Sequence, residues 1–288
     1  MKDYIALTKP RITWLILMST GVGYFFGAQK SLAGFTGWHF LTLLHTIVGT
    51  GLIASGTAAL NQWYERAADG KMRRTQARPL PSGRLTAGKA LAFAIAISVA
   101  GFLELWFGAN PLAALLGLFT LLTYLFVYTP LKQRSPHSTT IGSIPGAMPP
   151  LIGFAAASGT LTWEAWVLFA ILFLWQFPHF YAIAWMYKDD YARAGIRMLP
   201  VVEPDGKSTA RRILLYSIAL IPISLMPKYF AMAGNAYLYG ALALGLAFVY
   251  YGLRIRWDRT RQQARGVLLA SVVYLPALFT LMLLDRPA

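Results

Sequence analysis

Three oxygen-bearing side chains, Asn61, Glu65 and Asp69, lie four residues apart in the stretch NQWYERAAD. Residues with this spacing lie on one stripe of a helix, drifting about 40° per step. Two carboxylates and an amide oxygen suit a hard divalent cation. Mg²⁺ in particular is often shared between carboxylates and the phosphates of a substrate. The alternative is a solvated helix end, but ionisable groups beside an apolar segment are costly and usually face a cavity. We therefore predict a metal site here, with Glu65 and Asp69 as ligands.

The loop after this stripe is basic. Its cations are Lys71, Arg73, Arg74, Arg78 and Arg84. Acids that hold a metal beside bases that hold anions are typical of a diphosphate site. We predict that Arg73 and Arg78 bind the diphosphate.

A second polar cluster, YKDDYARAG, follows the apolar stretch FLWQFPHFYAIAWM. Tyr187 and Tyr191 are four residues apart, with Lys188, Asp189 and Asp190 between them. Two adjacent acids cannot share one face of a helix, so at most one is expected to be a direct metal ligand. We take Asp190 as that candidate, Asp189 remaining open, and Lys188 as a further diphosphate contact. An ordinary polar helix terminus is the alternative.

Two further sets of residues are candidates. The loop YTPLKQRSPHS brings Tyr128, Lys132 and Arg134 toward the diphosphate, although bases in such loops are also common topology signals. His179 lies inside an apolar segment, where a histidine is expensive and suggests a function. We predict that His179 contacts a substrate, and a hydrogen bond between helices is the alternative.

The composition places these residues in a membrane protein. Of its residues, 57% are hydrophobic and only 13% are charged. A soluble domain cannot bury that much apolar surface. Its 26 Lys and Arg against 11 Asp and Glu give a charge of +15. These bases lie between apolar runs, so positive-inside topology explains them better than nucleic-acid binding. The chain has no cysteine, which excludes disulfides and thiolate chemistry.

Apolar segments long enough to span a membrane, which takes about 20 residues, occur nine times. They cover residues 12–28, 38–60, 88–107, 111–129, 139–157, 163–186, 210–227, 235–253 and 266–284. The first resembles a signal peptide, but the rest of the chain is equally apolar, so we interpret it as a retained helix. The fifth is rich in Gly and Pro and needs neighbouring helices to cover its backbone groups.

The Lys and Arg residues are distributed unequally between the two sides of these spans. All but Lys30, Lys228 and Arg286 fall on one side. This predicts a cytoplasmic N-terminus, an external C-terminus and an odd number of spans. We expect one domain over residues 1–288. A weak echo between MRRTQARPLPSG and AGIRMLPVVEPDG indicates an internal duplication, whose two loops would build one site.

The sequence also resembles a known family. The segments LTKPR, NQWYERAADGKMRRTQARPLPSG, YTPLKQRS, GAMPPLIG, WQFPHFYAIAW and KDDYARAGIRMLPVV resemble the protohaem IX farnesyltransferase family, a haem branch of the UbiA-type intramembrane prenyltransferases. The resemblance implies an all-α bundle of nine helices around a central cavity in the cell inner membrane. It also implies Mg²⁺ and farnesyl diphosphate at Asn61, Glu65, Asp69 and the Asp189–Asp190 pair.

The acceptor that the resemblance implies is haem B. The products would be haem O, with water added, and diphosphate, and a terminal oxidase assembly stays open as a protein partner. Two departures are present. Many relatives have Asp where this chain has Tyr187 and Tyr191, and many in the haem branch have Asn in place of Ser138. The alternatives are a related prenyltransferase acting on an aromatic acid, quinone precursor or chlorophyll-type ring, and a membrane transporter.

Overall fold

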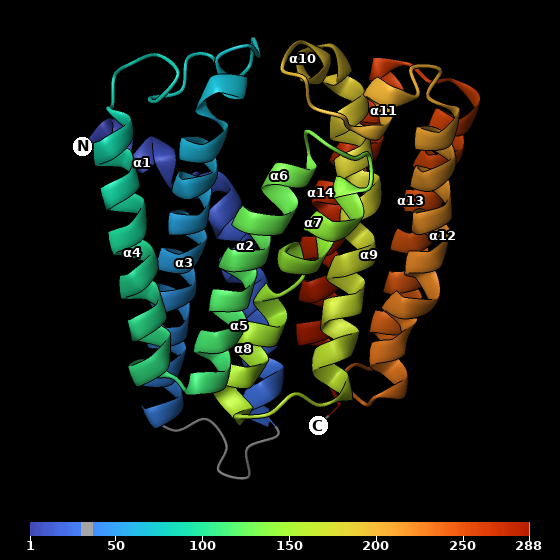
Figure 1. Ribbon diagram of the computed structural model, residues 1–288. Coiled ribbons are helices and arrows are strands. Elements are labelled where there is room, and N and C mark those ends of the chain that lie inside the picture. Colours follow the sequence, from blue (N-terminus) through green and yellow to red (C-terminus); the bar gives the residue numbers. More distant parts are fainter. Residues whose placement is uncertain (30–36, 288) are drawn as a thin grey trace.

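The computed structural model describes residues 1–29 and 37–287, in which all regular elements are helices. The long helices run up and down between two ends of one bundle (Figure 1). The elements are α1 Lys2–Leu7, α2 Pro10–Gln29, α3 Gly37–Asp69, α4 Ala87–Gly108, α5 Pro111–Leu122, the π-helix Thr123–Tyr128, α6 Thr129–Leu131, α7 Ser138–Gly146, α8 Pro149–Ser158, α9 Trp163–Met186, α10 Lys188–Arg193, α11 Leu199–Val202, α12 Lys207–Tyr229, α13 Asn235–Trp257 and α14 Arg261–Leu284.

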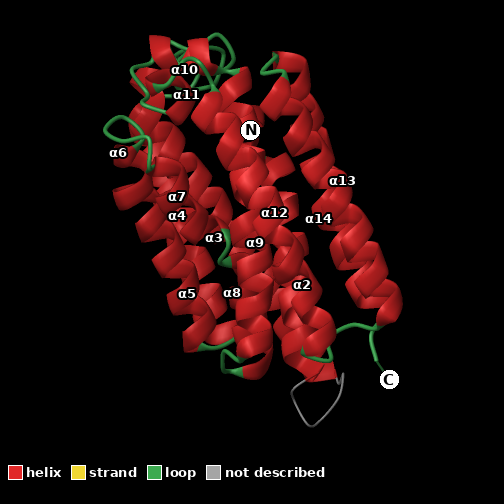
Figure 2. Ribbon diagram, turned by 90° about the vertical axis from the view of Figure 1, so that its right-hand side faces the viewer, coloured by secondary structure: helices red, strands yellow, loops and turns green. Residues whose placement is uncertain are grey.

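Eight segments of the described chain are long and apolar enough to cross a membrane. The 20-residue helix α2 lies beside them (Figure 1), so each of the nine predicted segments is helical. The all-α, multi-pass membrane class is thereby confirmed. The N-terminus lies near the end that carries α10 and α11, and the C-terminus lies at the other end (Figures 1 and 2), as an odd number of passes requires. Lys30, counted on the outer side, lies outside the described residues.

Helix α3 continues past residue 60, where the predicted membrane span ends, and runs to Asp69, as the predicted helical stripe requires. In this extension Asn61, Gln62, Glu65 and Asp69 are buried, so tertiary contacts stabilise the helix there. Gln62, for example, donates to the backbone oxygen of Leu7 over 2.8 Å. The extension carries Asn61, Glu65 and Asp69 on one continuous helix.

The predicted fifth span is broken into α7 and α8 at Ala147 and Met148. As expected from its Gly and Pro content, neighbouring helices cover it. The buried side chain of Gln176 on α9 donates to the backbone oxygens of Ser143 and Leu172. Gly153 lets α8 approach α2, because a Cβ there would lie 1.9 Å from the Thr20 oxygen. The broken span is thus held between α2 and α9.

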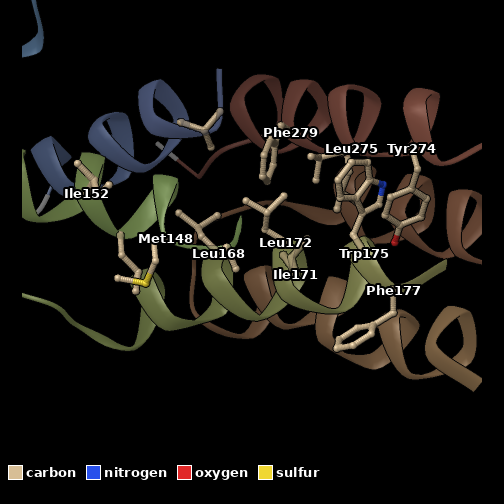
Figure 3. Packing of buried hydrophobic residues seen from close by; sticks show 14 of the residues in the cluster. Met148, Ile152, Leu168, Ile171, Leu172, Trp175, Phe177, Tyr274, Leu275 and Phe279 are labelled. Atoms are coloured by element: carbon tan, nitrogen blue, oxygen red, sulfur yellow. The ribbon is translucent and has the colours of Figure 1, made fainter. Parts of the chain in front are cut away.

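Apolar side chains also pack α9 against α14. In Figure 3, Leu168, Leu172 and Trp175 of α9 point toward Leu275 and Phe279 of α14. The Trp175 indole also donates to the backbone oxygen of Ser271 over 2.8 Å. This packing fixes α9, whose charged end carries the second polar motif.

Candidate active site

The predicted stripe on α3 is a buried polar chain. Asn61 and Asp69 are almost completely buried, and Glu65 is buried as well. The Asn61 amide donates to Glu65 Oε2 over 2.9 Å and lies 3.3 Å from the hydroxyl of Thr129. Because α3 is continuous, all three side chains face the same side, as their spacing predicts.

Each acid of the stripe is held by a base from another element. Lys132 Nζ lies 2.9 Å from Glu65 Oε1, and Arg78 Nη1 lies 2.8 Å from Asp69 Oδ2. Burial by itself lowers the pKa of Lys132, but the Glu65 carboxylate, together with Tyr128 and Tyr124, outweighs it, and the pKa stands above its ordinary value. Both bases were predicted as diphosphate contacts, and the structure brings them to the acids.

The other oxygen of Asp69, Oδ1, is buried and has no hydrogen-bond partner among the described residues. A buried carboxylate oxygen without a partner is costly, and the large majority of buried polar atoms are satisfied. It therefore marks a position where a cation fits, and Mg²⁺ prefers such oxygen ligands. The donor set of Asn61, Glu65 and Asp69 suits that ion.

Lys9, at the junction of α1 and α2, is a fourth polar group at the stripe. Its ammonium lies 3.4 Å from Asn61 Oδ1. The backbone is left-handed at Lys9, with φ at 49°, a strained conformation of the kind found at functional sites. Burial lowers the pKa of Lys9 to about 7, and the charges of Arg78 and Lys132 act in the same direction.

Tyr128 lies beside Lys132. The ammonium of Lys132 lies 4.6 Å from the centre of the Tyr128 ring, in cation–π geometry. Tyr124 meets Tyr128 edge-on at 4.9 Å. Arg134, by contrast, is exposed. Of the three residues predicted from this loop, Lys132 contacts the stripe directly and Tyr128 lies beside Lys132.

The second motif is built around a break between two helices. Helix α9 ends at Met186, and the short α10 begins after Tyr187. Asp190 is buried, is ion-paired with Arg193, and accepts from the backbone N–H of Arg73 over 3.3 Å. Asp189 is exposed. Burial and contact with the first loop therefore favour Asp190 of the two adjacent acids.

The two tyrosines of this motif both contact Arg74. The guanidinium lies 4.8 Å from the ring centre of Tyr187 and 4.7 Å from that of Tyr191. It also donates to the Tyr191 hydroxyl over 2.7 Å. The loop after α3 and the segment after α9 therefore contact one another at one end of the bundle, as predicted. Lys188 lies over the ring of Trp185 at 4.4 Å.

In the described part of the chain, no three acidic or histidine side chains assemble as a ready metal site. Glu65, Asp69 and Asp190 are each paired with a base. Their role as three ligands of one site stays a prediction. The unpartnered oxygen of Asp69 is the atom that supports it most directly.

His179 is held by α14. Its Nδ1 lies 2.8 Å from the hydroxyl of Ser271, and its ring stacks on Trp175 with centres 4.9 Å apart. This is the hydrogen bond between helices considered as the alternative, although it uses only one ring nitrogen. Contact of His179 with a substrate stays a prediction.

Two residues at the site were absent from the predicted set. Lys9 gave a signal in the motif LTKPR, whose base precedes a proline at the start of the first span. Arg74 was one of five bases in its loop, and nothing in the sequence indicated that it would lie between two tyrosines. Only the fold joins residues so far apart along the chain.

Comparison with known proteins gives a consistent picture. The sequence pattern of the UbiA prenyltransferase family matches residues 16–277. A protoheme IX farnesyltransferase of Solibacter usitatus is 68% identical over 100% of this chain and 99% of its own length. One of Koribacter versatilis is 48% identical over 99% of this chain and 94% of its own length.

Solved structures share the fold at low identity. A digeranylgeranylglyceryl phosphate synthase superposes with a TM-score of 0.79 at 16% identity, over 99% of this chain and 97% of that one. A UbiA homologue from Archaeoglobus fulgidus, bound to DMAPP and Mg²⁺, gives a TM-score of 0.67 at 17% identity, over 97% and 99%.

Proposed function

We propose that farnesyl transfer takes place at the α3 stripe of this chain, which belongs to the UbiA prenyltransferase family and, within it, to the protohaem IX farnesyltransferases. The donor is farnesyl diphosphate and the acceptor is a vinyl group of haem B. The bond between farnesyl C1 and the diphosphate oxygen breaks, and C1 bonds to the terminal vinyl carbon. Water adds to the neighbouring carbon with loss of a proton, which gives haem O and free diphosphate.

The chain's own bases stabilise the leaving group. Arg78 and Lys132 each hold one acid of the stripe at hydrogen-bond distance, so both are already fixed beside it. A diphosphate placed there meets two oriented cations and gains negative charge as the C–O bond lengthens. Preorganised charge of this kind stabilises a transition state more than a ground state. Arg73, Arg134 and Lys188 are further predicted contacts from the same end of the bundle.

Mg²⁺ is the metal that we assign to the stripe. Glu65 and Asp69 would hold it, with Asn61 beside them and Asp190 from the second motif. When bound, the ion would neutralise the diphosphate and strengthen it as a leaving group. The support within this chain is the unpartnered Asp69 Oδ1. Archaeoglobus fulgidus homologues of the same fold, bound to Mg²⁺ with DMAPP or GPP, point the same way.

The protein also has to position the two substrates and keep water out of the site. The reaction needs no strong nucleophile from the protein, because the vinyl group attacks a farnesyl carbon that is becoming cationic. Burial of the stripe residues would keep water away until the new bond has formed. The rings of Tyr124 and Tyr128 lie beside Lys132, and their faces suit a developing cation.

The charge asymmetry supports a cytoplasmic position for this chemistry, and the family resemblance supports the cell inner membrane. The stripe, the loop after α3 and the segment after α9 all lie at the end that carries the N-terminus (Figure 1). Both substrates are amphiphiles, so the lipid bilayer is the phase from which they would arrive. Nucleic acid is not proposed as a partner.

One observation carries the proposal: a buried carboxylate, Asp69, with one oxygen on Arg78 and the other unpartnered. Membranes carrying the protein, incubated with haem B, farnesyl diphosphate and Mg²⁺, should form haem O, identified by its mass. The reaction should stop when Mg²⁺ is chelated. Prenylation of another ring with no haem O would overturn the choice of acceptor, and absence of any prenyl transfer would overturn the enzyme assignment.

A further inference from the structure

Two guanidinium groups share the ring of Tyr187 at the charged end of the bundle. Arg74, from the loop after α3, lies 4.8 Å from the ring centre, and Arg261, the first residue of α14, lies 5.9 Å from it. Tyr187 itself stands at the break between α9 and α10. We call Arg74, Tyr187 and Arg261 the Tyr187 cluster. It joins three segments that are far apart in the sequence.

Neither guanidinium is neutralised by an acid. Among the described residues, no carboxylate oxygen lies within 4.0 Å of Arg74 or of Arg261. Asp190, three residues after Tyr187, is ion-paired with Arg193, and Asp69, five residues before Arg74, is ion-paired with Arg78. Both guanidinium groups are solvent-accessible, and Arg74 uses one donor on the Tyr191 hydroxyl. The remaining N–H donors of two arginines, held over one ring, are available to an anion.

The diphosphate has other partners. Arg78 and Lys132 lie directly on the acids of the α3 stripe, with Lys9 beside Asn61. The Tyr187 cluster therefore offers a second pair of cations beyond those that the leaving group needs. Arginine is the side chain best suited to carboxylates, since its planar fork matches both oxygens of the group.

The acceptor carries two carboxylates. A haem has two propionates on one edge of the ring, and its vinyl groups lie away from that edge. Ionised carboxylates are expensive to bury in a bilayer, so an amphiphilic porphyrin keeps this edge at the aqueous interface. Its vinyl edge can then extend toward the α3 stripe. Two guanidinium groups that have no acidic partner among the described residues match the two propionates in number and charge.

We propose, on the basis of the function assigned above, that the Tyr187 cluster binds the two propionates of the porphyrin acceptor and so orients its vinyl edge toward the prenyl diphosphate. Arg74 and Arg261 each take a carboxylate, and Tyr187 fixes the spacing between them. The cluster is a specificity-determining site for a dicarboxylic ring.

The test compares haem B with its dimethyl ester, in which both propionates lose their charge. The full-length protein in membranes is assayed for farnesyl transfer to each acceptor. The wild type should prefer the diacid. Arg261→Ala should raise the KM for haem B about tenfold, the scale of one charged hydrogen bond, and leave the KM for farnesyl diphosphate within about twofold. The preference for the diacid over the ester should largely disappear.

Matched variants separate this role from a structural one. Arg256→Ala removes an exposed arginine from the same end of α13 and should leave all three quantities unchanged. Tyr187→Leu removes the shared ring and should resemble Arg261→Ala, whereas Tyr187→Phe keeps the ring and should restore the diacid preference.

A rise in the KM for farnesyl diphosphate in Arg261→Ala would assign the cluster to the donor and overturn the proposal. So would an equal loss with the diacid and the ester. These outcomes differ from failure of the proposed function, in which the wild type itself would transfer no farnesyl group to either porphyrin.

Discussion

The two polar motifs at the charged end of the bundle differ in construction. The first is a buried stripe on one uninterrupted helix, with its acids held by Arg78 and Lys132. The second lies where a helix breaks, and its spaced positions are the aromatic rings of Tyr187 and Tyr191, which hold Arg74. A rigid acidic stripe suits a metal and a leaving group whose geometry is fixed. A more exposed arrangement of rings and cations suits recognition of a second anionic ligand.

The largest expected effect concerns the acid with the unpartnered oxygen. Asp69→Asn keeps the size of the side chain but removes the charge, and should lower the rate of haem O formation about 100-fold or more, as expected for loss of preorganised charge. Asp189→Asn, at an exposed acid, should change it less than about twofold. Rates in membranes with matched protein levels check this. Near-normal turnover in Asp69→Asn would remove Asp69 from the metal site.

The ion pair between Lys132 and Glu65 should matter for stability as well as for rate. Lys132→Met leaves the buried Glu65 carboxylate without a base to pair with and should cost about 3–5 kcal/mol of unfolding free energy. The double variant Lys132→Met with Glu65→Gln removes both charges and should recover much of that loss, without recovering activity. Thermal unfolding in detergent measures the first effect. Equal stability of the single and double variants would contradict the pairing.

Asp190 should show a smaller effect than Asp69. It accepts from the Arg73 backbone and pairs with Arg193, so Asp190→Asn should loosen the contact between the two loops and lower turnover about tenfold. The adjacent Asp189→Asn is the control. If the two variants were equally active, the second motif would have no role for a buried acid.

The smallest effect is a dependence on pH at Lys9. Its pKa is lowered to about 7, so it is charged below that pH and loses its charge as the pH rises through it. Affinity for farnesyl diphosphate should therefore fall between about pH 6 and 8. Lys9→Arg stays charged across that range and should show a flatter profile. The KM for the donor at each pH measures this, and identical profiles in both proteins would contradict it.

The sequence predicted the stripe well, and it predicted the second motif only in part. Asn61, Glu65 and Asp69 are spaced by four on a helix, a local pattern that needs no knowledge of the fold. The nine helical segments likewise follow from runs of apolar residues. The membrane span predicted from hydropathy ends at residue 60, where the buried polar contacts begin, although α3 itself runs on to Asp69.

Contacts between distant segments were beyond local patterns. Lys9 reaches Asn61 across 52 positions, and Arg74 reaches Tyr191 across 117. Nor did spacing distinguish Asp189 from Asp190, since that depends on which side of α10 is buried. These pairings arise from helix packing, which brings together the ends of α2, α3, α9 and α14.

The central claim is that the α3 stripe binds the metal and the diphosphate. The most direct measurement is an experimental structure of the protein with Mn²⁺ and a non-reactive farnesyl diphosphate analogue, with the metal located by its anomalous signal. We predict a metal ion in direct contact with Asp69 Oδ1, and a diphosphate against Arg78 and Lys132. A metal and diphosphate bound elsewhere, with Asp69 still held only by Arg78, would contradict the account.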